Sequence, residues 1–248
     1  MPRKYDGKKD KRHTILLLGP PKAGKTTLSF NLFGKENTVG LAYDVDGLKV
    51  VEDVDALIIN PANAWEDTIE ALRVLKKEYA KKTTIVISDI TTCGMMFLRG
   101  APQSRDPRRS YGVAIDQLRQ LVEKLKFDFP NHHIIFEAVD MYLEDEHEAV
   151  IFTYPNVIGR YTFAQQLPGM VDHVFYVVPP KIKKIVDSKG KVTKEVERVI
   201  LTQTDGIKLA GNRVNVAGKE PILELTEKVS IEDGVDNIER LRKKLLGG

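Results

Sequence analysis

The stretch "GPPKAGKTT" (residues 19–27) decides the fold. It stands between the apolar run "TILLL" (14–18), which has the length of a buried strand, and "LSFNLF" (28–33), which continues as a helix. The stretch fits the pattern G-x-x-x-x-G-K-[ST], in which a turn between a strand and a helix wraps its backbone N–H groups around the phosphates of a nucleotide. We therefore predict a phosphate-binding loop rather than an ordinary glycine and proline turn.

Within this loop, the residue types have separate mechanical roles. Gly24 lets the main chain approach the anion, and the helix that starts near Lys25 directs its free N–H groups and its dipole toward it. Lys25 is expected to reach the β- and γ-phosphates, and the hydroxyl of Thr26 is expected to ligate Mg²⁺. The predicted cofactor-binding residues are Gly19, Pro20, Pro21, Lys22, Ala23, Gly24, Lys25, Thr26 and Thr27.

Length and composition limit the other possibilities. With 248 residues, 42% of them apolar, we expect one main domain at 13–226, a basic flexible tail at 1–12 and a C-terminal helical extension at 227–248. The net charge of +3 excludes a polycation, so any nucleic-acid surface must be local. The single cysteine, Cys93, excludes an internal disulfide and fits a reducing cytoplasm. No apolar stretch approaches the ~18 residues of a membrane span, so we expect a cytoplasmic protein without a membrane partner.

Apolar runs of strand length alternate with segments of helical period. The expected strands are 14–18, 39–43, 56–59, 84–88, 133–139, 173–178 and 197–203. Continuous apolar runs are typical of parallel strands that are covered on both faces. We therefore predict an α/β fold, a mostly parallel twisted sheet flanked by helices, with its ligand crevice beyond the carboxyl ends of the strands. The turn-like "DSKGK" within 179–196 predicts antiparallel strands at one edge, and 236–246 predicts a terminal helix.

A nucleotide site of this kind also needs a magnesium carboxylate and a group that activates water. The strand "TIVISD" ends in Asp89, which would lie beside the phosphate loop if its strand neighbours the first, and we predict Asp89 and Thr26 as metal ligands. A helix cap or a turn is the alternative role of such an aspartate. Asp44 and Asp46 in "AYDVDG" act in the site or form a turn. A further strand would supply the candidates for a γ-phosphate sensor, Glu137 and Asp140.

Seven short segments are informative together because of their order and spacing. They are "GPPKAGKTT", "YDVDGLK" (43–49), "NAWEDTIEAL" (63–72), "TIVISDIT" (84–91), "SYG" (110–112), "LPGMVDHVFYV" (167–177) and "LTQTDGIKLAGNR" (201–213). On these segments, residues 13–226 resemble the RecA-like P-loop ATPases of the phage and archaeal nucleotide-binding (AAA-type) family, which includes single-strand-annealing recombinases. The resemblance implies a RecA-like core, ATP and Mg²⁺ as cofactors, single-stranded DNA as a partner, and a homo-oligomeric ring or filament. A phage-encoded member would work in the host cytoplasm.

At three positions the chain departs from the pattern of this family. The family carries glutamate as the water-activating base where this chain has Asp46, one methylene shorter, so the resemblance implies slow hydrolysis. The usual strand ending is hydrophobic-Asp-Ser, whereas this chain reads Ser88-Asp89, so either residue could serve the magnesium. The "KxR" motif that reaches the nucleotide of the next subunit corresponds to 211–213, where only Arg213 matches and a solvated surface arginine is the alternative. The expected catalytic residues are Lys25, Asp46, Asp89 and Arg213.

Two loops of a RecA-like core face the axis of the assembly, and the resemblance places them at 93–112 and 140–163. The first loop contains arginines next to Tyr111. Basic side chains with interleaved aromatic rings are typical of a groove that follows a phosphate backbone and stacks bases. The second has an acidic tip, "EDEHE" (144–148), which would repel phosphate. Oligomer contacts or a mobile lid are the alternative roles of both loops. The predicted nucleic-acid contacts are Arg99, Arg105, Arg108, Arg109, Tyr154, Arg160 and Tyr161.

Three functions fit these patterns. The first is an ATPase in which ATP binding and hydrolysis are coupled to the binding or annealing of single-stranded DNA in recombination or repair. The second is a small-molecule phosphotransferase, in which 99–109 forms a lid over a nucleotide acceptor. The third is an assembly protein that binds nucleotide and hardly hydrolyses it, which the aspartate at position 46 keeps open. The chain lacks a guanine-reading motif of the N-K-x-D type, which favours ATP over GTP.

Overall fold

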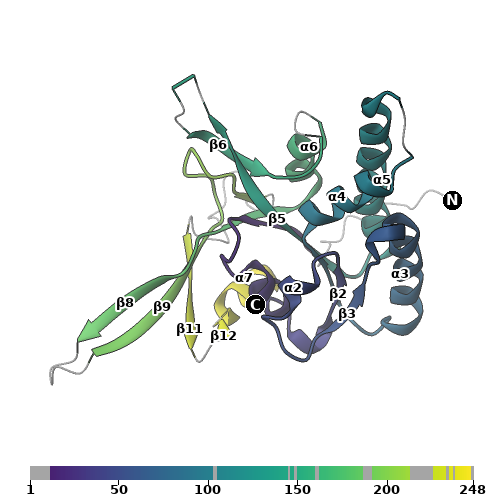
Figure 1. Ribbon diagram of the computed structural model, residues 1–248. Helices are drawn as coiled ribbons and strands as arrows, with labels where there is room; N and C mark the ends of the chain where they lie inside the picture. Colours follow the sequence, from purple (N-terminus) through teal and green to yellow (C-terminus); the bar gives the residue numbers. More distant parts are fainter. Residues whose placement is uncertain are drawn as a thin grey trace, which may run out of the picture.

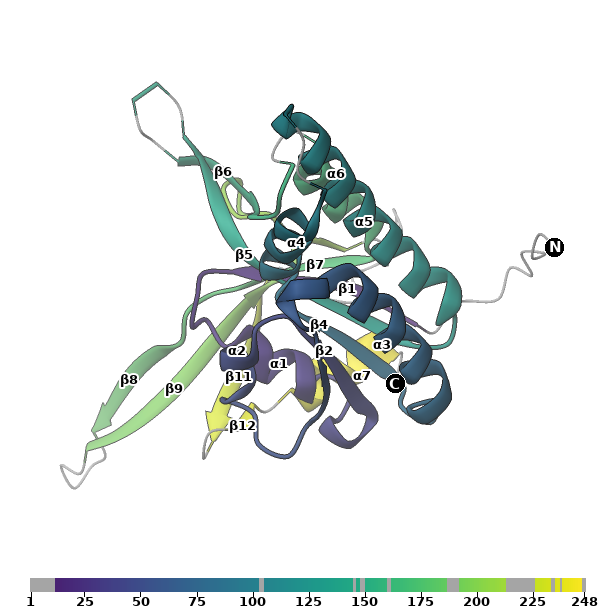
Figure 2. The same ribbon diagram turned by 45° about the vertical axis from the view of Figure 1, so that its right-hand side comes forward.

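The computed structural model describes residues 12–102, 105–144, 146–147, 150–159, 162–186, 192–212, 226–232, 235–236 and 238–246. It is built around a twisted sheet that is covered by helices (Figures 1 and 2). The parallel strands are β1 (Thr14–Gly19), β2 (Thr38–Ala42), β3 (Asp55–Ile58), β4 (Thr84–Ser88), β5 (His133–Glu144) and β7 (His173–Val177). Their order in the sheet is β3-β2-β4-β5-β1-β7.

This strand order places β5 between the strand of the phosphate loop and β4. β1 pairs in parallel with β5 on one side and with β7 on the other. The expectation that Asp89 follows a neighbour of the first strand is therefore wrong, because β4 is one strand further away. The residue opposite Leu17 of β1, at the centre of the sheet, is instead Glu137 of β5.

Antiparallel strands extend the sheet beyond β7. They are β9 (Val192–Leu201), which pairs with β7, β8 (Lys181–Val186) and β11 (Thr226–Glu232), and β12 (Val235–Asp236), which pairs with β11. The short β10 (Gly211–Asn212) also pairs with β7, and β6 (Val150–Pro155) forms a hairpin with β5. The β8–β9 hairpin projects from the body of the molecule (Figure 1). These observations confirm the predicted α/β fold with antiparallel strands at one edge; the turn at 187–191 lies outside the described residues.

The described residues form seven α-helices, of which six lie between strands and α7 follows the last strand. They are α1 (Lys25–Asn31), α2 (Val45–Leu48), α3 (Ala64–Glu78), α4 (Ile90–Gly100), α5 (Pro107–Asp128), α6 (Phe163–Met170) and α7 (Glu239–Leu246). Two short 3-10 turns, η1 (Lys35–Asn37) and η2 (Pro61–Asn63), precede β2 and α3.

The alternation of side chains along β1 divides the core into two layers. Leu16 and Leu18 point into the larger layer, which contains apolar residues of α3, α4, α5 and α6. Ile15 and Leu17 point into the smaller layer, which contains residues of α1 and α7. A strand that is apolar on both faces is expected only where helices cover both faces of a parallel sheet, as they do here.

The segment 93–112 is mostly helical, which corrects the expectation of a long loop. α4 ends at Gly100 and α5 begins at Pro107, so only a short connection separates the two helices. The carboxylate of Asp106 caps α5 by accepting a hydrogen bond from the backbone N–H of Arg108, and Pro107 suits the first turn of a helix. Capping aspartates and an N-terminal proline resemble loop residues in the sequence, so the pattern concealed the start of the helix.

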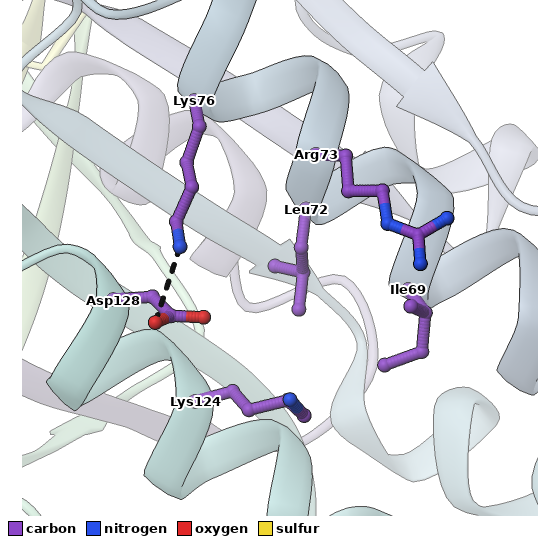
Figure 3. Close-up of a pocket in the computed structure, with 6 residues that line it drawn as sticks. All are labelled: Ile69, Leu72, Arg73, Lys76, Lys124 and Asp128. Carbon is purple, nitrogen blue, oxygen red and sulfur yellow. Dashed lines mark ion pairs between the residues drawn. The ribbon is translucent and has the colours of Figure 1, made fainter.

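Helices α3 and α5 are joined near their C-terminal ends by an ion pair of 3.1 Å between Lys76 Nζ and Asp128 Oδ1 (Figure 3). A cavity of about 220 Å³ lies beside this pair, and Arg73 and Lys124 also line it. Because β4 and β5 start after these helix ends, the cavity lies at the amino-terminal edge of the sheet, away from the phosphate loop.

Helix α7 packs on the helix that follows the phosphate loop. Leu241 and Leu245 are buried in the smaller core layer, and the guanidinium of Arg242 donates hydrogen bonds to the carbonyls of Leu32 and Asn31 at 2.8 and 2.6 Å. These carbonyls lie at the end of α1, where a helix leaves its last carbonyls without an intrahelical partner. The C-terminal segment is therefore anchored directly to the element that carries the loop.

Replacing Leu241 by alanine is expected to lower the free energy of unfolding by about 2 to 5 kcal/mol, because it removes a buried side chain and leaves a cavity. Leu246→Ala in the last turn of the same helix is the matched control; Leu246 is 53% exposed, and its change should stay within about 0.5 kcal/mol. Urea unfolding followed by circular dichroism measures both. Equal values for the two variants would show that α7 contributes no packing energy.

Candidate phosphate-binding site

The loop leaves β1 at Gly19, at a position that no larger residue can occupy without a shift. The φ angle of Gly19 is +155°, and a Cβ atom there would lie 2.4 Å from the carbonyl oxygen of Val177 in β7. Lys22 and Gly24 then turn the chain with φ angles of +64° and +88°. The glycines of the sequence pattern thus correspond to a close approach of two strands and to a left-handed residue at the start of α1.

The ammonium group of Lys25 lies across this loop. Its Nζ donates hydrogen bonds to the carbonyl oxygens of Gly19 and Pro20, at 2.8 and 2.9 Å. Burial lowers the pKa of Lys25, and the negative charges of Glu137, Asp89 and Asp140 oppose that shift. The loop thus presents a cation at its centre that can exchange two neutral carbonyl partners for the charged oxygens of a phosphate.

A cavity of about 560 Å³ opens beyond the loop, within the range of ~300 to 1,000 Å³ that is common for ligand pockets. It lies at the carboxyl ends of the parallel strands, as the sequence pattern predicted. The loop residues that line it are Pro21, Lys22, Gly24, Lys25, Thr26 and Thr27. The other lining residues are Asp44, Asp46, Gly47, Val50, Ser88, Asp89, Glu137 and Val139.

Glu137, a candidate γ-phosphate sensor in the sequence, contacts the helix that follows the phosphate loop, and this contact the sequence did not reveal. It is 2% exposed, and its carboxylate accepts hydrogen bonds from the hydroxyls of Thr26 at 2.8 Å and Ser29 at 2.5 Å. Burial raises the pKa of Glu137 to about 7, although both hydroxyls and Lys25 lower it. A glutamate inside the apolar strand "HIIFEAV" was the available signal, because a buried carboxylate needs partners.

Asp89 caps the helix that follows β4. Its carboxylate accepts hydrogen bonds from the backbone N–H groups of Thr91 and Thr92, at 3.0 and 3.3 Å, and from the Thr92 hydroxyl at 2.5 Å. Its φ angle of +63° is unusual for a residue with a side chain. The alternative role weighed for Asp89 in the sequence, a helix cap, is therefore present, and the residue also lines the cavity together with Ser88.

Asp44 and Asp46 reach the cavity from the short helix α2. Asp44 caps this helix by accepting a hydrogen bond from the backbone N–H of Asp46 at 3.1 Å. The Asp46 side chain is 82% exposed and forms an ion pair of 2.5 Å with Lys49. The hydrogen bond from Lys49 lowers the pKa of Asp46. The carboxylate expected to activate water is thus paired with a neighbouring cation at the surface.

The exposed arginines of the predicted nucleic-acid surface gather where α4 ends and α5 begins. Arg99 lies in the last turn of α4, Arg105 in the connection, and Arg108 and Arg109 in the first turn of α5. We call these four residues the arginine cluster. Tyr111 is 47% exposed in the following turn of α5.

Tyr154 corrects one of the predicted nucleic-acid contacts. It is buried, with 7% of its surface exposed, and belongs to the larger core layer, so its ring cannot stack on a base. The alternation of β6 points this side chain inward, which the single tyrosine in "TYP" did not reveal. Arg160, Tyr161 and Arg213 lie outside the described residues.

The oxygen groups of the cavity fit Mg²⁺. Among the described residues, no group of three or more His, Cys, Asp or Glu side chains could hold a metal by itself. Magnesium is ordinarily held by one or two protein oxygens together with phosphate oxygens and water, rather than by a cage of protein ligands. The Thr26 hydroxyl and the carboxylates that line the cavity supply such oxygens.

In the part of the chain that the structure describes, no helix is long and apolar enough to cross a membrane.

Comparisons with known proteins identify the domain. The family described as "AAA domain" matches residues 11–214. No curated protein matches the chain. Among solved structures, the crystal structure of the RadB recombinase superposes over 90% of this chain and 89% of its own, with a TM-score of 0.47 and 12% sequence identity. A superposition of this quality carries no argument about function.

Proposed function

Because the chain belongs to the AAA-domain family, we propose that it binds ATP with Mg²⁺ at the phosphate loop and hydrolyses the ATP in a cycle coupled to single-stranded DNA. The observation that carries the proposal is the cavity at the carboxyl edge of the sheet, where Lys25 and Thr26 follow directly on β1. Parallel α/β sheets bind their ligands at this edge.

Two loop residues, Lys25 and Thr26, have separate proposed roles in nucleotide binding. The ammonium of Lys25 would leave the carbonyls of Gly19 and Pro20 and pair with oxygens of the β- and γ-phosphates. The Thr26 hydroxyl would supply one oxygen to Mg²⁺, which neutralises phosphate charge when it is bound. Both side chains line the cavity.

Hydrolysis is proposed to depend on Asp46 and, in a homo-oligomeric ring or filament, on Arg213 of a neighbouring subunit. The hydrogen-bonded ion pair with Lys49 lowers the pKa of Asp46, which makes this carboxylate a weaker base toward water. This pairing, and the shorter side chain of aspartate, favour slow turnover. They also support a second candidate function, an assembly protein that binds nucleotide and hydrolyses it weakly.

Coupling to DNA is proposed to run through helix α4. Asp89, which caps the start of α4, lines the cavity, whereas Arg99 lies in its last turn. A single helix thus connects the nucleotide cavity to the arginine cluster. Exposed arginines bind the phosphate backbone through electrostatic attraction and counterion release, so contact with DNA should weaken steeply as salt rises.

ADP release is expected to change when single-stranded DNA is added at low salt. If the four arginines contact four phosphates, DNA affinity should fall about 50-fold between ~50 and ~200 mM salt. The variant with Arg105, Arg108 and Arg109 changed to alanine should lose most of the DNA effect while its ADP release without DNA stays unchanged. The matched control changes the exposed cations Arg73, Lys77 and Lys81 of the α3 region, which alters net charge equally. ADP release and fluorescence anisotropy of labelled DNA measure the two effects.

The other functions give different outcomes in the same assay. ADP release that requires a small-molecule acceptor and ignores DNA would identify a phosphotransferase and contradict the proposal. Nucleotide binding with almost no ADP release would support the assembly protein. Equal loss of the DNA effect in the arginine variant and its control would contradict a specific role of the arginine cluster.

A further inference from the structure

The carboxylate that contacts the phosphate-loop threonine comes from β5 and not from β4. Glu137 stands opposite Leu17 in the pairing of β5 with β1, directly below α1. Its Oε2 accepts the hydrogen bond from Thr26 at 2.8 Å, and its Oε1 accepts the one from Ser29 at 2.5 Å. Thr26 and Ser29 are three residues apart and therefore lie on one face of α1. Both carboxylate oxygens are thus directed at the helix that begins at the phosphate loop.

This contact decides where the lone pairs of Thr26 point. A hydroxyl has one proton to donate and two lone pairs that can accept or ligate. Because the Thr26 proton is donated to Glu137, both lone pairs of Oγ1 remain available on the other side of the oxygen. Thr26 lines the cavity, so they are available to a cation there. Protein groups that ligate a metal are commonly oriented by a hydrogen bond to a carboxylate behind them.

Asp89 does not orient the Thr26 hydroxyl in this structure, because its hydrogen bonds go to other groups. Its two carboxylate oxygens accept three hydrogen bonds from the first turn of its own helix. Its strand is also separated from β1 by β5. The end of β4 therefore supplies a helix cap, whereas the middle of β5 supplies the buried carboxylate that touches the loop.

We propose that Glu137 is the positioning residue of the magnesium site, which holds the Thr26 hydroxyl with its lone pairs toward the metal. The inference rests on the proposed function, because it assigns a role within the same nucleotide site. Glu137 acts through Thr26, from whose hydroxyl it accepts a hydrogen bond. Asp89, which the sequence pattern predicts as a metal ligand, lines the same cavity and stays a candidate ligand beside Thr26.

The test is the gain in ATP affinity that Mg²⁺ provides, measured as the ratio of dissociation constants in EDTA and in Mg²⁺. Glu137→Gln keeps the size of the side chain but offers one acceptor instead of two and can donate a proton to Thr26. It should reduce the magnesium gain about 10-fold or more and leave affinity in EDTA unchanged or higher. Thr26→Val removes the hydroxyl itself, so its loss of the magnesium gain is the largest that the Glu137 variant can reach. Isothermal titration with ATP gives both constants.

Ser29→Ala is the matched control, since it removes the contacts of the Ser29 hydroxyl with the same buried carboxylate and with the Thr26 carbonyl, and leaves the hydrogen bond from the Thr26 hydroxyl to Glu137. A merely structural role of Glu137 would make Ser29→Ala and Glu137→Gln lose the magnesium gain together, which would overturn the proposal. A loss in Asp89→Asn with retention in Glu137→Gln would also overturn it. If circular dichroism shows that Glu137→Gln is unfolded, Glu137→Asp is measured instead, with the same expected loss because the shorter carboxylate withdraws from Thr26.

The failure of this inference is distinguishable from the failure of the proposed function. Wild-type protein that binds no ATP in either buffer would overturn the proposed function, and the role of Glu137 with it. Wild-type protein that binds ATP with a magnesium gain that survives in Glu137→Gln would overturn only the role of Glu137. Wild-type protein with equal affinity in both buffers would overturn the magnesium site and leave nucleotide binding in place.

Discussion

Replacing Lys25 by alanine is expected to weaken ATP binding about 100-fold or more. The cavity lining holds two lysines, Lys22 and Lys25, and four carboxylates, Asp44, Asp46, Asp89 and Glu137. Without Lys25, the groups around the phosphates would be mainly negatively charged. Lys22 would not replace its charge, because Lys22 is exposed to solvent. Removing one partner of a buried charge pair typically costs about 3 to 5 kcal/mol, which corresponds to this loss of affinity.

The fold of the Lys25→Ala variant should stay intact. The ammonium contacts two loop carbonyls next to an open cavity, where water can replace it. No side chain of the two core layers depends on it, because Lys25 belongs to neither. Circular dichroism should therefore match the wild type, and so should urea unfolding below pH ~7, where the buried carboxyl of Glu137 is protonated and does not need the neighbouring cation.

Two further variants sharpen this measurement. Lys77→Ala removes an exposed lysine of α3 that does not line the cavity, so ATP affinity should change less than about twofold. Lys25→Arg keeps the charge, but the larger planar guanidinium does not match a loop that holds a compact ammonium, so it should not restore affinity. Titration with a fluorescent ATP analogue measures all three variants. Unchanged affinity in Lys25→Ala would contradict nucleotide binding at this loop.

The phosphate loop and the class of sheet could be predicted because both depend on local features of the sequence. A strand, a glycine-rich turn and a helix in direct succession fix the geometry of "GPPKAGKTT" without reference to distant residues. Likewise, apolar runs that are continuous rather than alternating indicate parallel strands between two layers of helices. The two core layers on either face of β1 are the packing result of that pattern.

The order of strands in the sheet could not be predicted because it depends on long-range pairing. The sequence predicts Asp89 beside the loop if its strand pairs with β1; β5 lies between the two strands, yet Asp89 still lines the cavity next to the loop. The same insertion brings Glu137 under α1, where it meets Thr26 and Ser29. Glu137 could be seen in the sequence as a charge in an apolar strand, but its partners lie more than a hundred residues away.

Two other differences come from polar residues that serve as structural ends. Asp89 caps α4 and Asp106 caps α5. Most of the predicted loop at 93–112 therefore belongs to these two helices, and only the short link between them is not helical. Tyr154 is of a residue type that often stacks on bases, but its position in β6 points the side chain into the core, where it is buried. A residue type alone does not distinguish a cap from a ligand or a core ring from a stacking platform.

The stability of the protein without nucleotide and metal is expected to fall with rising pH because of Glu137. Burial raises the pKa of its carboxyl from 4.5 to about 7 in the folded protein, whereas the unfolded chain ionises near the ordinary value. Below pH ~4.5 the carboxyl is protonated in both states and carries no cost. As the pH rises through ~7, the folded protein must bear a buried charge, so this contribution to stability is lost. Between about pH 5 and pH 8 the loss should reach roughly 2 to 3 kcal/mol.

Glu137→Gln isolates this effect, because glutamine fills the same space and does not ionise. Urea unfolding at both pH values gives the stability of the variant relative to the wild type, and other titrating groups cancel in the comparison. The variant should gain roughly 2 to 3 kcal/mol on the wild type as the pH rises from about 5 to 8. Glu123→Gln, at an exposed position of α5, should follow the wild type within about 0.5 kcal/mol at both pH values. A difference between Glu137→Gln and the wild type that does not change with pH would mean that the buried carboxyl is ionised throughout, held by Lys25 and the two hydroxyls more strongly than burial opposes it.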